Sequence, residues 1–138
     1  MEYIARFVKN GNIKIGNTMW SWNKLAGNGF IAGCKGTCGE HCQGCYNVDN
    51  PQKSPCYVFK SYNLYGWDHS TVVKGHVRNT NVMRDNIDKA FNDIRLQLNR
   101  ARKKPSAVRI HASGEIETTQ ELREWIETAA MSPSIPFY

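Results

Sequence analysis

The stretch SAVRIHASGE, residues 106–115, stands between two segments that have a helical period. Its first part, residues 106–112, is a short run rich in β-formers, and Ser113-Gly114-Glu115 ends it. A strand between two helices with short connections is typical of βα units on a parallel sheet. This stretch therefore predicts an α/β fold.

The segment before this strand predicts a long helix. Over residues 81–104 apolar side chains recur every three or four positions. Thr80 or Asn81 suits the N-cap, and Pro105 stops the helix just before the strand.

The segment after the strand predicts a second helix over residues 119–131. Thr118 and Glu121 form a capping box at its start, and Pro133 follows its end. Residues 135–138 then look like the start of another strand. The order helix, strand, helix, strand resembles the βα units of a partial (β/α) barrel.

The first part of the chain has a different character. Residues 3–15 alternate partly in apolar character around the turn pair Asn10-Gly11, which predicts an N-terminal β-hairpin. From residue 17 onward the chain is rich in glycine and asparagine and shows no lasting period. We expect a metal to order this long loop, because a structureless segment of that length is uncommon in a compact domain.

These patterns predict a single domain over residues 1–138. Its expected parts are a hairpin over residues 1–16, a cysteine and aromatic loop region over 17–80, and the helix-strand-helix-strand part over 81–138. No apolar signal-peptide core or membrane-length apolar run is present, so we expect a cytosolic protein.

The chain carries a net charge of +6. A basic balance favours an anionic partner such as a nucleic acid or nucleoprotein complex, although a solvated basic surface explains it equally well. The basic residues at the end of the predicted helix 81–104 suit the negative end of a helix dipole.

Four cysteines lie close together, at positions 34, 38, 42 and 45. In a reducing compartment such a group indicates metal binding before disulfides. The spacing of Cys38, Cys42 and Cys45 lets three thiolates converge from one tight loop, which favours an iron-sulfur cluster. Cys34, Cys42 and Cys45 are an alternative set of three ligands.

Zinc is the second interpretation of the same loop. It takes four ligands at tetrahedral corners, and its usual ligand pairs lie farther apart in sequence than these cysteines do. The candidates for the fourth ligand are Cys34, Cys56 and His41, or, on an iron-sulfur cluster, a bound S-adenosylmethionine.

The spacing Cys38-x3-Cys42-x2-Cys45 resembles that of the radical S-adenosylmethionine (SAM) superfamily. Members of that superfamily bind a 4Fe-4S cluster after the first strand of a partial (β/α) barrel, and their second strand ends in a Gly-Glu pair that receives the methionine amino group of SAM. Here Gly114-Glu115 follows the predicted central strand in the same order. The resemblance implies a cluster on the three cysteines and SAM near Gly114 and Glu115.

Residues 13–138 also resemble the "gene product 88" family of phages and plasmids, whose members have a similar cysteine loop. Together the two resemblances imply a metal-binding protein of phage or mobile-element origin, similar to a truncated radical SAM protein. Whether such a chain catalyses a reaction stays open at the level of the sequence.

A binding module is the alternative function. A basic domain stabilised by structural zinc would suit a phage inhibitor of a host nucleic-acid machine, such as an anti-CRISPR protein. We also expect a protein partner or a second copy at the C-terminal edge, because Met131, Ile135, Phe137 and Tyr138 place apolar surface beside an open strand.

Overall fold

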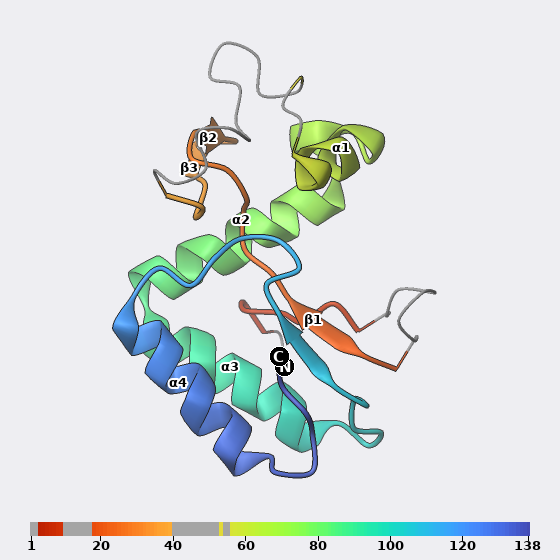
Figure 1. The fold of residues 1–138 in the computed structure, drawn as a ribbon, viewed down its shortest axis with the longest axis vertical. Coiled ribbons are helices and arrows are strands. Elements are labelled where there is room, and N and C mark those ends of the chain that lie inside the picture. Colours follow the sequence, from red (N-terminus) through yellow and green to blue (C-terminus); the bar gives the residue numbers. More distant parts are fainter. Residues whose placement is uncertain (1–2, 10–17, 40–52, 54–55) are drawn as a thin grey trace.

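The computed structural model describes residues 3–9, 18–39, 53 and 56–138, apart from the side chain of Asp68 (Figure 1). Its elements in chain order are β1 Trp20–Trp22, β2 Phe30–Ile31, β3 Cys34–Lys35, α1 Tyr57–Leu64, the 3-10 helix η3 Trp67–His69, α2 Thr71–Asp85, α3 Ile87–Arg100, β4 Val108–Ile110 and α4 Thr119–Met131. The predicted α/β class is confirmed, since four α-helices are combined with small sheets. No barrel forms within the described ranges, and the expected partial barrel is not confirmed.

The central sheet pairs strands that are far apart in the sequence. β1 and β4 are parallel, with Trp20 opposite Val108 and Trp22 opposite Ile110. On the far side of β4, Val108 forms a parallel bridge with Phe137, as expected of the predicted strand 135–138. The parallel segments therefore lie beside one another in chain order, joined by helical connections.

The N-terminal segment joins the opposite side of this sheet, where Val8 forms an antiparallel bridge with Ser21. Asp93, a buried residue of α3, holds the backbone of this segment in place. Asp93 accepts hydrogen bonds from the amides of Ile4 and Ala5, at 2.9 and 3.1 Å. Residues 10–17, which include the second strand of the predicted hairpin, lie outside the described residues, so the hairpin stays a prediction.

The predicted single helix over residues 81–104 is wrong in its bounds. The structure has two helices, and α2 begins ten residues earlier at Thr71 because the hydroxyl of Ser70 caps it by accepting from the amide of Val73. Asn86 divides them: its backbone leaves the helical region at φ −154°, and its side chain accepts from the amide of Lys89 to begin α3.

The expected loop region over residues 17–80 also needs correction. It holds β1 and the hairpin of β2 and β3, followed by α1, η3 and the first half of α2. α1 is only 8 residues long, and no side chain caps its first turn, so the sequence contains little signal that predicts this helix. By contrast α4 has the predicted bounds, and Thr118 caps it by accepting from the amide of Glu121 at 3.1 Å.

Two hydrophobic clusters form the interior. The larger one packs the tryptophans of β1 and the C-terminal half of α2 against α3, β4 and α4. The smaller one packs Leu25, Ile31 and Cys34 against α1 and Val73 of α2. α2 therefore contributes side chains to both clusters (Figure 1). No described helix is long and apolar enough to cross a membrane.

The expected apolar surface at the C-terminus is only partly present. Met131 and Tyr138 are exposed, at 67% and 61%, as the sequence predicts. Ile135 instead lies in the larger cluster with only 7% of its surface exposed, which corrects its place in the expected interface.

Gly75 lies inside α2, where a glycine costs helix stability. A Cβ atom built there meets only the guanidinium of Arg78, at an ordinary contact distance of 3.6 Å. We therefore expect Gly75→Ala to raise the free energy of unfolding by roughly 0.5–1 kcal/mol. Urea unfolding monitored by circular dichroism measures this change, and a loss of stability would contradict the helical assignment at this position.

Candidate functional site

The carboxyl ends of β1 and β4 meet at one edge of the sheet. The amide of Lys24 donates to the carbonyl of Ser113 at 3.0 Å, which continues the parallel pairing beyond the two strands. The amide of Ser113 donates to Oδ1 of Asn23, and its hydroxyl donates to the carbonyl of Lys24 at 2.9 Å. In α/β folds this edge is where ligands commonly bind.

Gly114 is required for this close approach. Its φ of +87° is a conformation that other residues rarely adopt, and an added Cβ atom would lie 2.9 Å from the backbone of Lys24. The chain therefore turns tightly at Gly114, and Glu115 follows with its side chain exposed.

Thr37 joins this turn to the start of the cysteine loop. The hydroxyl of Thr37 accepts a hydrogen bond from the amide of Glu115 at 2.8 Å and donates to the carbonyl of Leu25 at 2.9 Å. The amide of Cys38 in turn donates to the carbonyl of Gly27 at 2.9 Å. Two predicted site residues 77 positions apart, Cys38 and Glu115, are thus held in one place.

A groove of about 510 Å³ opens at this junction. Its lining consists of the segment Lys35–Gly39, Arg84 of α2, and the residues after Gly114, which are Glu115, Ile116 and Glu117. The lining carries both cationic and anionic side chains, so the groove suits a polar ligand that bears charges of both signs.

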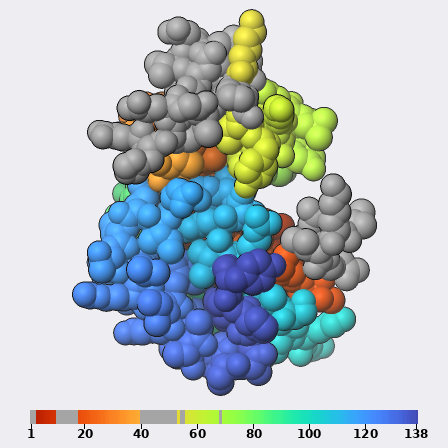
Figure 2. Space-filling model, in the orientation of Figure 1, coloured from red at the N-terminus to blue at the C-terminus, as the bar shows by residue number. Residues whose placement is uncertain are grey.

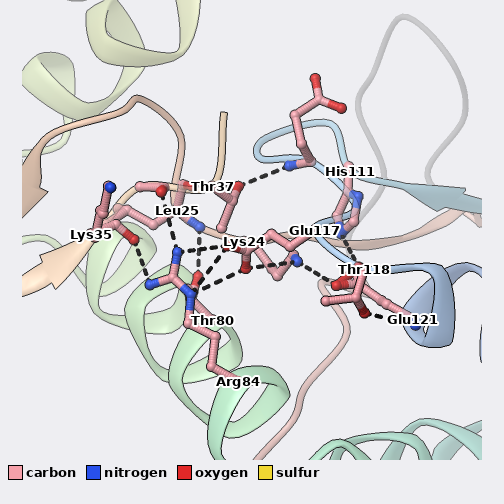
Figure 3. A network of polar contacts seen from close by, with 12 residues as sticks. Lys24, Leu25, Lys35, Thr37, Thr80, Arg84, His111, Glu117, Thr118 and Glu121 are labelled. Carbon is pink, nitrogen blue, oxygen red and sulfur yellow. Dashed lines mark hydrogen bonds and ion pairs between the residues drawn. The ribbon is translucent and has the colours of Figure 1, made fainter. Parts of the chain in front are cut away.

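Arg84 lines the groove and contacts residues on both sides of it (Figure 3). Its guanidinium donates to the carbonyl of Lys35 at 2.7 Å and pairs with Glu117 at 2.9 Å. Arg84 thereby ties β3 to the segment that leads into α4. Sequence reasoning missed this residue, because its partners Lys35 and Glu117 lie 49 and 33 positions away in the chain.

Lys24 lies beneath the groove with no exposed surface. Its ammonium group is 2.5 Å from Oε1 of Glu121 and 3.3 Å from Oε1 of Glu117 (Figure 3). Burial raises the pKa of Glu121, while the charge of Lys24 acts to lower it. Burial and the same lysine lower the pKa of His111 to about 3, so this histidine is neutral at physiological pH.

Cys38 lies at the groove, next to the turn at Gly114. It lines the groove, and its Sγ accepts a hydrogen bond from the amide of Gly27 at 3.1 Å. Hydrogen bonds from backbone amides stabilise a thiolate, and in iron-sulfur proteins they help to set the reduction potential of the cluster. Cys42, Cys45 and His41 lie outside the described residues, so their predicted roles stay predictions.

Cys34 has different surroundings. It is 4% exposed in the smaller hydrophobic cluster, with Sγ 3.5 Å from Oδ1 of Asn81 and 3.8 Å from Nη1 of Arg84. Burial raises the pKa of its thiol, which disfavours the thiolate that a metal needs. Cys56 is partly buried and packs against this cluster, as does Cys38. Among the described residues, no three His, Cys, Asp or Glu side chains gather closely enough to hold a metal.

A buried polar network supports the turn from the opposite side. The hydroxyl of Tyr62 is 2.7 Å from Nδ1 of His76 and 2.9 Å from the hydroxyl of Ser113, and it accepts from the amide of Ala26 at 3.3 Å. Burial raises the pKa of Tyr62 to about 12 and lowers that of His76 to about 4. Trp67 packs against Phe59 and Tyr62 of the smaller cluster, with its ring centroid 5.5 Å from that of Phe59.

The buried His76 makes stability depend on pH. In the unfolded chain a histidine binds a proton near pH 6.5, whereas folded His76 does so only near pH 4. Stability is therefore lost as pH falls from 6.5 towards 4, by about 3 kcal/mol from this residue. Urea unfolding at several pH values should show a steeper loss for the wild type than for His76→Gln, whose neutral amide can still donate a hydrogen bond to the hydroxyl of Tyr62. Equal slopes would contradict the buried, neutral histidine.

The basic residues near the end of α3 have local partners. Lys104 donates to the carbonyls of Leu98 and Asn99 at 2.6 and 2.8 Å, which satisfies the end of the helix. The ammonium group of Lys9 lies 4.7 Å from the ring of Trp20. The contacts of Lys104 agree with the helix-dipole interpretation of the basic cluster, to which Lys9 does not belong. Nucleic-acid binding stays a prediction.

A family model described as Gene product 88 matches residues 6–138 of the chain. No curated protein and no solved structure gives a significant match.

Proposed function

The chain belongs to the gene product 88 family, and on this basis we propose that it is a metal-binding protein of phage or mobile-element origin. In this proposal Cys38, Cys42 and Cys45 hold a 4Fe-4S cluster, and SAM binds beside it at Gly114 and Glu115. The observation that carries the proposal is the hydrogen bond between Thr37 and the amide of Glu115, at 2.8 Å. It brings the first cysteine of the motif next to the Gly-Glu turn, as the radical SAM resemblance implies.

The surroundings of Cys38 suit a cluster ligand. Its sulfur faces a groove and receives an amide hydrogen bond, whereas Cys34 is buried beside Asn81 and Arg84. This contrast favours Cys38 over Cys34 as the first of three cluster ligands. A 4Fe-4S cluster with three cysteine ligands supplies one open iron and an electron for the reduction of SAM.

The residues around the groove suit the methionine end of SAM. The exposed carboxylate of Glu115 is an acceptor for an ammonium group, and Gly114 lets the backbone pass close to Lys24 without a side chain in between. Arg84 is held by Glu117 and by the carbonyl of Lys35, so we assign it a role in shaping the groove rather than in binding.

Metal content tests the first part of the proposal. After anaerobic reconstitution with iron and sulfide, we expect the wild type to hold about four iron and four sulfide per chain. Cys38→Ser should lose most of this iron, while the matched variant Cys34→Ala should keep it. Stoichiometric zinc without uptake of iron would overturn the cluster and favour the zinc-stabilised binding module instead.

SAM binding is tested on the protein that has been shown to hold a cluster. We expect SAM to change the electron paramagnetic resonance spectrum of the reduced cluster in the wild type and not in Glu115→Gln. Thr37→Val should weaken SAM binding without lowering iron content, and Thr37→Ser should restore it, because serine keeps the hydroxyl that accepts from Glu115. An unchanged spectrum in the wild type would reject SAM as the ligand.

A further inference from the structure

α4 buries one face and exposes a second apolar row. Glu121, Trp125 and Thr128 point into the interior. Leu122 and Ile126 are 44% and 60% exposed, and Ala130 is exposed as well. These three residues are spaced four apart, so they form one continuous row along the helix.

Charged residues border this row on one side. Arg123 and Glu127 each follow a residue of the row by one position, so both lie about a quarter turn from it in the same direction. Both are exposed, and within the described part of the chain the ion pair of Glu127 is a long one, with Arg95 at 3.8 Å. Arg95 pairs more closely with Glu124, at 2.6 Å, which leaves Glu127 available to another cation.

We propose that α4 packs antiparallel against α4 of a second copy of this chain, about a two-fold axis at Ile126. Ile126 then meets the partner's Ile126, and Leu122 meets the partner's Ala130. A large side chain thus faces a small one on both sides of the axis, which lets the two helices interdigitate closely.

Charge and symmetry favour a second copy over another partner. In the antiparallel arrangement, Arg123 comes within one turn of the partner's Glu127, and the symmetric pair repeats the contact. The two helix dipoles also oppose each other favourably. A parallel two-fold arrangement would instead place the charged flanks of the two copies on opposite sides of the row, where Arg123 does not reach the partner's Glu127. The row is therefore complementary to itself, as a two-fold interface requires.

The helix is accessible for such a contact. In Figure 2 the blue residues of α4 form the lower left part of the visible surface, and no other described element covers them in this view. Because Ile135 is buried, the expected C-terminal edge loses one of its apolar residues, and the proposal places the interface on the row of α4 instead.

Disulfide cross-linking tests the geometry on the full chain. Under mild oxidation, Ile126→Cys should form a disulfide between two copies at position 126, identified by mass spectrometry of the linked peptides. Gln120→Cys is the matched control, since it is exposed on the same helix but outside the row. Equal cross-linking at positions 120 and 126, or none at 126, would overturn the proposal.

Light scattering tests the energetics. We expect a dimer at micromolar concentration for the wild type. Ile126→Asp should be a monomer that keeps the helical circular dichroism signal of the folded chain. Arg123→Glu should weaken dimerisation by about tenfold, because two ion pairs are lost and two repulsions appear. The double variant Arg123→Glu, Glu127→Arg should restore it. Three results would contradict the antiparallel pairing: a monomeric wild type, a dimer that persists in Ile126→Asp, or a double variant that dimerises as weakly as the single one. Capture of an unrelated protein by the row would assign the row to a different partner.

Discussion

Replacing Lys24 by methionine is expected to lower the free energy of unfolding by about 3–5 kcal/mol. The lysine is fully buried, and its ammonium group is 2.5 Å from a carboxylate oxygen of Glu121, which is itself 1% exposed. Methionine has a similar length but no charge, so the variant leaves a buried carboxylate without its partner. Urea unfolding at neutral pH measures the loss.

Two controls separate the buried charge from other effects. The double variant Lys24→Met, Glu121→Gln should recover part of the stability, because the unpaired charge is gone. Glu124→Gln, which breaks the half-exposed pair with Arg95, should cost less than about 1 kcal/mol. A comparably small loss for Lys24→Met would show that Glu121 is already protonated, in the direction in which burial shifts its pKa.

The substitution Gly36→Ala is expected to cost about 3 kcal/mol and to disturb the groove. A Cβ atom at Gly36 would lie 2.1 Å from the carbonyl oxygen of Gly27 and 2.5 Å from that of Ala26. Both obstacles are backbone atoms, so the segment that carries Thr37 must move away from its hydrogen-bond partners. We expect the amide resonance of Glu115 to shift in nuclear magnetic resonance spectra, since that amide donates to Thr37.

Gly39→Ala is the matched control for this prediction. Gly39 has a φ of +64°, and no atom of the described residues lies within 4 Å of an added Cβ, so alanine there is expected to cost the backbone conformation, roughly 1–2 kcal/mol. The resonance of the Glu115 amide should keep its position. A loss for Gly36→Ala no larger than for Gly39→Ala would show that the two segments are not in close contact.

The sequence predicts the C-terminal part of the fold well, because its signals are local. Thr118 caps α4 at the predicted position, and the strand before it follows from a run of β-formers between two helices. Asn86 shows where this reasoning fails. The apolar period continues across it, but its side chain caps a new helix, and a cap inside a period is not visible from spacing alone.

The candidate site divides in the same way. Motif spacing led to Cys38 and to Gly114 with Glu115, and the structure places Cys38 and Glu115 at one groove, beside the turn at Gly114. Lys24, Tyr62 and Arg84 were missed, because each acts through a partner more than 30 positions away. No periodicity or short motif records contacts over such separations.

The division of α2 between two hydrophobic clusters has a consequence for how the molecule opens. The smaller cluster is anchored to the larger one by this helix, and the amide of Leu25 donates a hydrogen bond to the hydroxyl of Thr80 on it. A sub-global opening of the smaller cluster would leave the sheet and α4 folded. It would also separate Cys38 from Glu115, so the groove exists only while both units are closed. The groove therefore has the lifetime of the less stable unit, and a ligand that bridges Cys38 and Glu115 would lengthen that lifetime by mass action.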